Sequence, residues 1–246
     1  MFLLIDADNA FPLTPAGEPK LFDVCPHPTT TRITLPDGTV AARLERVRAA
    51  ELVEYTGDAR SHAGHPQVAR AVALLRARER ERFDPADGSP LTWDDAGAQA
   101  HGASGRPIFP RIDPSVIGVV QNADGSAILL GENARRPGYF TCIAGYVDVG
   151  ETAEAAFARE VMEETGRRIH DVRYVCSQPW ALSGALMLGF TARTSDVEPQ
   201  SATDGELTRI IWASREDLAG LTLAREGTIA RDLIARWARG DLAGGN

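Results

Sequence analysis

The chain has 246 residues, of which 43% are hydrophobic and 24% charged, and its formal net charge is −8 from 34 acidic and 26 basic residues. This composition is ordinary for a globular protein with one large domain or two modest ones. It argues against a protein that binds phosphate backbones along their length, because such a protein needs a basic face.

The cysteines and the N-terminal residues indicate in which cellular compartment the protein is expected. Cys25, Cys142 and Cys176 are too few and too scattered for a disulfide framework, and none belongs to a CxxC pair. The first ten residues lack the basic region of a signal peptide. No apolar run approaches the ~20 residues that a membrane span needs. We therefore expect a cytoplasmic protein that does not bind membranes.

The N-terminal part is predicted to be a small β-rich domain. Residues 2–6 form a strand-like run, and LPDGT at 35–39 is typical of a turn between two strands. Residues 65–83 have helical spacing, with Pro66 suited to the first turn. We interpret residues 1–83 as this domain with its closing helix.

The remaining elements predict an α+β fold in which helices sandwich a mixed sheet. Residues 84–107 are rich in Gly, Ala, Asp and Pro and are interpreted as a linker before a domain at 108–246. That domain opens with a hairpin of strands at 115–121 and 126–132. The following elements are a strand run at 139–147, a helix after Gly150, strands at 172–178, 185–192 and 207–213, and helices at 215–221 and 228–238. Strands of mixed order with few helices favour this architecture.

One helix carries a cluster of acidic residues. Glu160, Glu163 and Glu164 are spaced i, i+3 and i+4, so their carboxylates lie on one face, opposite an apolar face that includes Phe157. Three like charges repel one another unless a cation compensates them. Arg159 offers part of that compensation, and Mg²⁺ or Mn²⁺ is the stronger candidate. Taken alone, such a face is usually a solvated surface.

The wider pattern resembles the Nudix box, GX5EX7REUXEEXGU. Gly145, Glu151 and the run REVMEETG at 159–166 match its fixed positions. Arg167 departs from it, because the family has an apolar residue there; this should slightly weaken the end of the helix. The resemblance implies a Nudix α/β/α sandwich that hydrolyses a pyrophosphate with divalent metal.

The same resemblance implies roles for the site residues. Glu164 or a partner is the general base, Glu163 belongs to the catalytic set, and Arg159 orients the glutamates. Two or three Mg²⁺ or Mn²⁺ ions are held by Ala144, through its carbonyl, and by Glu160, Glu163, Glu164 and Glu206.

A second motif is similar to the signature of the NADH pyrophosphatase branch. SQPW stands at 177–180, where the family has SQPWPFPxS, but residues 181–185 read ALSGA and lack both later prolines and the last serine. FPRIDP at 109–114 matches the family's FPRxDP run. The resemblance implies substrate contacts from Phe109, Tyr146, Gln178, Pro179, Trp180, Ala181, Leu182, Ser183, Gly184, Ala185 and Ala230.

The linker departs from the family at its zinc module. Where family members commonly carry four cysteines, this chain has Asp84, Asp87, His101 and Ser104. Such residues make a poor structural zinc site, although a weak oxygen-rich site is conceivable. We predict a degenerate zinc-ribbon-like linker that binds no zinc and is held by packing.

The expected activity is the hydrolysis of NADH or NAD⁺ to a nicotinamide mononucleotide and AMP. The resemblance also implies removal of NAD caps from RNA 5′ ends and a homodimer. The altered ALSGA run keeps a second substrate class open, namely ADP-ribose or another nucleoside diphosphate derivative. A non-catalytic nucleotide sensor is a third hypothesis, but we would expect such a protein to lose the box glutamates.

Overall fold

The structure is a computed structural model, and it describes residues 1–134 and 137–242. It divides into two compact units, the first comprising Met1–Ile112 with Pro179–Gly184 and the second Asp113–Gln178 with Ala185–Asn246. Within the described part, no helix is both long and apolar enough to cross a membrane. The finer division of the N-terminal part, at residues 83 and 107, stays a prediction.

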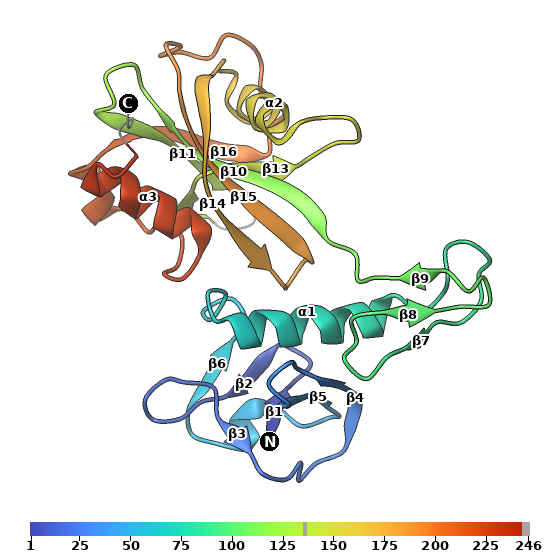
Figure 1. Cartoon of the computed structure of the whole chain (residues 1–246). Helices are drawn as coiled ribbons and strands as arrows, with labels where there is room; N and C mark the ends of the chain where they lie inside the picture. Colours follow the sequence, from blue (N-terminus) through green and yellow to red (C-terminus); the bar gives the residue numbers. More distant parts are fainter. Residues whose placement is uncertain (135–136, 243–246) are drawn as a thin grey trace. The chain divides into compact units, whose positions relative to one another are not determined.

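The first unit is built on a four-stranded sheet with strand order β3-β1-β5-β4 (Figure 1). β1 is parallel to β5, whereas β4 and β5 form an antiparallel hairpin. The predicted turn is confirmed, since the Leu35 N–H donates to the Thr39 carbonyl across a Gly38 with φ of +82°. The strands are β1 (Phe2–Ile5), β3 (Leu21–Phe22), β4 (Thr29–Thr34) and β5 (Val40–Leu44), with β2 (Ala10–Pro12) and β6 (Thr56–Asp58) paired beside them and a short helix η1 (Ala49–Glu51).

Helix α1 (Pro66–Arg80) confirms the predicted helix but ends three residues earlier. Pro66 occupies its first turn, where the missing N–H is harmless, and the His65 ring accepts a hydrogen bond from the Val68 N–H. The helix packs on β4 and β5 through buried apolar residues that include Val72 and Leu75. The N-terminal part is therefore β-rich with one long helix, as predicted.

The linker forms a three-stranded sheet of β7 (Thr92–Trp93), β8 (Ala100–His101) and β9 (Pro107–Ile108). The buried carboxylate of Asp84 links two parts of this linker. It is 1% exposed and accepts hydrogen bonds from the Ser104 hydroxyl at 2.5 Å and the Ala86 N–H at 2.8 Å. Asp87 and His101 bond elsewhere, to Ser89 and Gln99. Hydrogen bonds as well as packing therefore hold the linker, which differs from the sequence-based expectation.

The second unit contains a seven-stranded mixed sheet. Its path runs β12-β11-β10-β15-β14, with β13 paired to β10 and β16 paired to β11. β10 and β15 are parallel, while β11, β13 and β16 join by antiparallel pairing. The strands are β10 (Asp113–Gln121), β11 (Ala127–Asn133), β12 (Phe140–Thr141), β13 (Ile143–Tyr146), β14 (His170–Trp180), β15 (Ala185–Arg193) and β16 (Leu207–Ser214).

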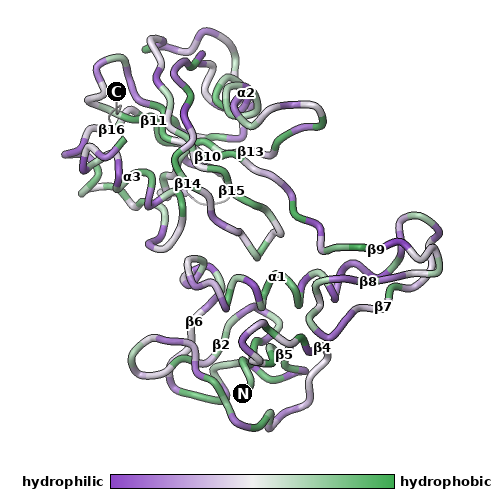
Figure 2. The backbone as a smooth tube through the Cα atoms, in the orientation of Figure 1, coloured by the Kyte–Doolittle hydropathy of each residue, from purple (hydrophilic) through white to green (hydrophobic). Residues whose placement is uncertain are grey.

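Alternating side chains of the central strands cover both faces of this sheet. On β10, Val116 and Val120 pack with helix α2 (Ala153–Thr165), whereas Ile117 and Val119 pack with helix α3 (Ile229–Arg239). Figure 2 shows the resulting hydrophobic run along β10 and β11.

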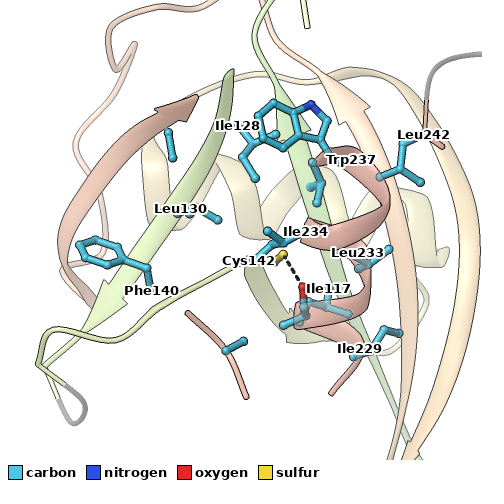
Figure 3. Packing of buried hydrophobic residues seen from close by; sticks show 14 residues of the cluster. Ile117, Ile128, Leu130, Phe140, Cys142, Ile229, Leu233, Ile234, Trp237 and Leu242 are labelled. Atoms are coloured by element: carbon cyan, nitrogen blue, oxygen red, sulfur yellow. Dashed lines mark hydrogen bonds between the residues drawn. The ribbon is translucent and has the colours of Figure 1, made fainter. Parts of the chain in front are cut away.

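The α3 face is closed by three residues of that helix. In Figure 3, Leu233, Ile234 and Trp237 lie over Ile128 and Leu130 of β11. The predicted α+β sandwich of helices around a mixed sheet, preceded by a smaller β-rich part, is confirmed. Two elements differ from prediction: the run at 139–147 breaks at Cys142 into β12 and β13, and residues 215–221 contain only a short 3-10 helix, η2 (Asp217–Gly220).

Candidate functional site

Helix α2 begins where the sequence supplies a turn and a cap. Gly150 has a φ of +88°, and the Thr152 hydroxyl accepts a 3.2 Å hydrogen bond from the Ala155 N–H. An N-cap threonine satisfies one of the free N–H groups at a helix start. The helix ends at Gly166, whose left-handed conformation closes the last turn. The glutamates between these ends therefore sit on a well-defined helix.

The departure at Arg167 brings hydrogen bonds to the end of the helix. The guanidinium is buried and donates hydrogen bonds of 2.8 Å to the carbonyls of Thr165 and Val197, and it lies 5.7 Å from the Trp212 ring centroid. It thus satisfies a carbonyl that the helix leaves free. Arg167 therefore makes hydrogen bonds where the family has an apolar residue, and the expected weakening stays a prediction.

The glycine that opens the box lies against a glutamate. A Cβ added at Gly145 would collide with the Glu160 carboxylate, so this close approach requires glycine. The Gly145 carbonyl in turn accepts a 2.7 Å hydrogen bond from the hydroxyl of Ser115, a buried residue of β10. Sequence reasoning missed Ser115, although a serine in an apolar strand was an available signal. The pairing of β13 with β10 therefore holds the backbone segment against which the Glu160 carboxylate packs.

Arg159 is the hub of the acidic cluster. Its guanidinium donates to both carboxylate oxygens of Glu151 at 2.8 and 3.0 Å, and to Glu160 and Glu163 at 2.9 Å each. It also donates to the Tyr146 carbonyl at 3.0 Å. These bonds, that to Glu151 foremost, raise the pKa of Arg159 above its usual value. One cation thus fixes the orientation of three glutamates.

Glu164 is set apart from this hub. It is only 6% exposed, whereas Glu163 is exposed, so the three glutamates do not share one open face as the spacing predicted. Glu164 instead lies at the edge of the buried face of α2. Burial first, and then the negative charges of Glu160, Asp204 and Glu206, raise its pKa to about 8, against a hydrogen bond from the Ala144 N–H.

Glu160 and Glu206 complete the cluster. Burial raises the pKa of Glu160 despite its bonds to Arg159, and the charge of Glu206 adds to that rise. Glu206 lies in a loop held to α2, because the Asp204 N–H donates to the Glu163 carbonyl at 2.9 Å and the Glu206 N–H donates to the Asp204 carboxylate. Sequence reasoning placed Glu206 near the box but missed Asp204, an acidic residue two positions earlier.

The chemistry of this donor set fits a divalent cation. Among the described residues, no three His, Cys, Asp or Glu side chains converge as a ready-made metal site. Negative neighbours nevertheless add to the rise in pKa that burial causes at Glu160 and Glu164, and Arg159 bonds to Glu160. Carboxylate oxygens are the ligands that Mg²⁺ and Mn²⁺ prefer, and a divalent cation would relieve this repulsion.

The predicted substrate residues are divided between the two units. Tyr146 is half exposed at the end of β13, beside Arg159. Phe109 is exposed in the first unit, which also contains residues 179–184. Within that unit the Trp180 ring lies 5.1 Å from the Arg60 guanidinium. Ala181 and Leu182 pack in the apolar cluster of α1. The backbone N–H groups of Ser183 and Gly184 both donate to the Trp180 carbonyl and so form a turn.

Three other predicted contacts are engaged inside the second unit. The Gln178 side chain donates to the Gly227 carbonyl and accepts from the Ile229 N–H, both at 2.8 Å, so it braces the start of α3. Ala230 is buried, and its carbonyl faces the Cys142 thiol (Figure 3). Ala185 is buried at the start of β15. Their substrate roles stay predictions.

Comparison with known proteins gives a family match and curated relatives. A family model described as NUDIX domain matches residues 111–237, just over half of the chain. The chain is 37% identical over 186 residues to NAD-capped RNA hydrolase NudC of Mycobacterium bovis, across 70% of this chain and 59% of that protein. It is 33% identical over 195 residues to NAD-capped RNA hydrolase NUDT12 of Homo sapiens, across 70% and 41%. The chain therefore matches less than two thirds of the length of these relatives.

One solved structure is also similar in fold. It is a NUDIX hydrolase from Nitrosomonas europaea, 19% identical, with a TM-score of 0.49 over 66% of this chain and 93% of that one.

Proposed function

Because this chain belongs to the NUDIX domain family, we propose that it hydrolyses the pyrophosphate of NADH and NAD⁺. Water would add across the phosphorus–oxygen–phosphorus bridge and release a nicotinamide mononucleotide and AMP. The observation that carries this proposal is the partly buried set of carboxylates around Glu164, together with the fixed glycine and charged positions of the box at Gly145, Glu151 and 159–166. The names of the curated relatives support the NAD class of substrate.

Divalent metal is part of the proposal. Ala144, through its carbonyl, and the carboxylates of Glu160, Glu163, Glu164 and Glu206 would hold Mg²⁺ or Mn²⁺. When bound, the metal neutralises pyrophosphate charge and lowers the pKa of water.

The chain's own residues would supply positioning and proton transfer. Arg159 holds Glu160 and Glu163 by hydrogen bonds of 2.9 Å, which limits the reorganisation needed when substrate binds. Glu164 would accept the proton from the attacking water, a role suited to a carboxylate whose burial raises its pKa. Tyr146 would offer an aromatic face near the cluster. The remaining predicted substrate contacts rest on resemblance alone.

The names of the curated relatives favour a second substrate of the same chemistry, an NAD cap on RNA. We propose that the chain also removes such caps, by cleavage of the same pyrophosphate. The net charge of −8 favours binding at the 5′ end over binding along the strand. ADP-ribose is the competing substrate, because residues 181–185 depart from the NADH pyrophosphatase signature.

We further propose a cytoplasmic homodimer. Sedimentation of the purified chain would test the oligomer, with a species of twice the 26.5 kDa chain mass as the expected result. A species of single mass at all concentrations would contradict it.

A product assay tests the proposed activity. Purified chain with Mn²⁺ is incubated with NADH, NAD⁺, ADP-ribose and an NAD-capped RNA, and the products are resolved by chromatography. We expect AMP and the reduced nicotinamide mononucleotide from NADH. Much faster cleavage of ADP-ribose than of NADH would overturn the assignment, and absence of any cleavage would favour the non-catalytic sensor.

A further inference from the structure

A cavity lies in the first unit, which does not contain the box. It encloses about 680 Å³ between β4, the C-terminal end of α1 and β7. Small-molecule sites usually measure roughly 300–1,000 Å³, so the space suits a ligand the size of a nucleotide.

The lining of this cavity is locally basic. Arg32, Arg78 and Arg82 line it, and among the residues that the structure describes none of the three forms an ion pair. Glu81 is the acidic residue of the lining, and its carboxylate accepts a 3.1 Å hydrogen bond from the Arg111 N–H. The C-terminal end of α1 adds a partial negative charge of about half a unit. The Arg32 guanidinium donates to the Thr29 hydroxyl at 2.8 Å and lies 5.7 Å from the Phe2 ring centroid, so Arg78 and Arg82 are the cations offered to a ligand. The charged residues of the lining still carry a net positive charge, on a chain whose net charge is −8.

Two aromatic residues stand beside these arginines. Phe83 is 59% exposed, so its ring is accessible to a ligand. Trp93 is held in place because its indole N–H donates to the Glu81 carbonyl at 3.2 Å. The Arg82 guanidinium lies 6.0 Å from the Phe83 ring centroid. Aromatic faces interleaved with arginines are typical of sites that stack a base and bind its phosphate.

The walls of the cavity are cross-linked by hydrogen bonds. The Arg78 guanidinium donates to the Arg32 carbonyl, which ties α1 to β4. The Leu91 N–H donates to the Arg82 carbonyl at 2.9 Å, which ties the chain before β7 to the end of α1. Hydroxyl groups of Thr30 and Thr92 add further donors to the lining. The site is therefore formed before any ligand arrives.

We propose that this cavity binds a nucleoside phosphate, with the phosphate on the arginines and the base against Phe83 and Trp93. The ligand is either a free mononucleotide or a nucleotide of a single-stranded nucleic acid, since both present the same chemistry. The site lies in the unit without the box, and the proposal holds whether or not the chain hydrolyses NADH.

Calorimetric titration of the full chain, with EDTA present to remove divalent metal, tests the proposal. The probes are AMP, adenosine, inorganic phosphate and a short oligoadenylate with a 5′ phosphate. We expect AMP and the oligoadenylate to bind at least about tenfold more tightly than adenosine or phosphate alone. Tighter binding of the oligoadenylate than of AMP identifies a strand as the source, and equal binding identifies a free nucleotide; both support a nucleoside phosphate.

A matched pair of variants locates the binding. Arg82→Ala should weaken AMP binding by about tenfold, because it removes a charged donor from an exposed position. Arg80→Ala removes the same charge two residues away and outside the lining, and it should change the Kd by less than about twofold. Phe83→Leu keeps an apolar side chain but removes the ring, and it should weaken AMP binding by roughly fivefold or more.

Three results would overturn the proposal. Equal losses in Arg80→Ala and Arg82→Ala would mean diffuse charge attraction. Phosphate that binds as tightly as AMP would remove the base from the account. AMP binding that none of the variants changes would place the nucleotide elsewhere. If Arg82→Ala does not fold, as judged by circular dichroism, Arg82→Gln replaces it.

Discussion

Two buried carboxylates, Asp84 in the linker and Glu164 on α2, have opposite surroundings. Both are nearly inaccessible, at 1% and 6% exposure. The Asp84 oxygens receive hydrogen bonds from the Ser104 hydroxyl and from the Ala86 N–H, and Asp84 is interpreted from the sequence as standing in place of a zinc ligand. Glu164 has one backbone donor and several negative neighbours, which with burial raise its pKa to about 8.

The difference teaches that burial alone does not make a carboxylate a metal ligand. A buried carboxylate that accepts enough hydrogen bonds stabilises the fold without a bound metal ion. One that faces other carboxylates favours either a proton or a cation. The Asp84 carboxylate therefore has its hydrogen-bond donors within the linker, whereas the α2 cluster has an excess of negative charge that suits the divalent cation we propose for it.

The largest expected effect comes from Glu164→Gln. The variant keeps the shape of the side chain but removes the charge, and it should reduce NADH hydrolysis by about 10²–10⁴-fold while leaving the fold intact. Initial rates and circular dichroism measure both. Glu154→Gln, an exposed change in the first turn of the same helix, should retain activity. Retained activity in Glu164→Gln would remove this residue from the proton-transfer role.

Gly145→Ala tests the close approach to Glu160. The added Cβ would collide with that carboxylate and displace it, so we expect activity to fall by about 10–100-fold. Gly220→Ala is the control, because a Cβ there meets nothing within 4 Å and its φ is not positive. Equal activity in the two variants would show that the position of Glu160 is unimportant.

Asp84→Ala tests whether the hydrogen bonds of the buried linker carboxylate stabilise the fold. Loss of the carboxylate leaves the Ser104 hydroxyl and the Ala86 N–H without their partner and should lower the unfolding free energy by about 1–3 kcal/mol. Urea denaturation measures the change, and Asp87→Asn, an exposed position, should be nearly neutral. A large loss of stability of the native chain on addition of EDTA would instead indicate that the linker depends on metal.

The smallest expected effect is on the pH dependence of stability, and it comes from the ion pair between Asp196 and Arg168. The Arg168 guanidinium holds the pKa of Asp196 at about 2, through hydrogen bonds of 2.8 and 2.9 Å. A lowered folded-state pKa gives stability that is present above pH ~4 and is lost as the pH falls towards 2. Arg168→Gln should therefore flatten the fall of the urea midpoint over this range. An unchanged profile would contradict the pairing.

Sequence alone predicted the box helix and its glutamates because spacing along a helix determines which side chains neighbour one another. It did not predict Asp204 as part of the cluster, since that depends on a loop closing onto the Glu163 carbonyl. It interpreted Asp84 and Ser104 as two lost zinc ligands, although they bond each other. It did not predict that both ends of the Gln178 amide contact the start of α3, and the substrate role of this residue stays a prediction. These features depend on tertiary contacts that no local pattern encodes.

Binding of Mn²⁺, followed by the electron paramagnetic resonance of the free ion, tests the central claim most directly. The native chain and Asp84→Ala should both remove Mn²⁺ from solution, and Glu164→Gln should bind it at least about tenfold more weakly. If the native chain leaves the Mn²⁺ signal unchanged, or if binding is lost in Asp84→Ala and kept in Glu164→Gln, the carboxylates of α2 are not the metal site and the account is contradicted.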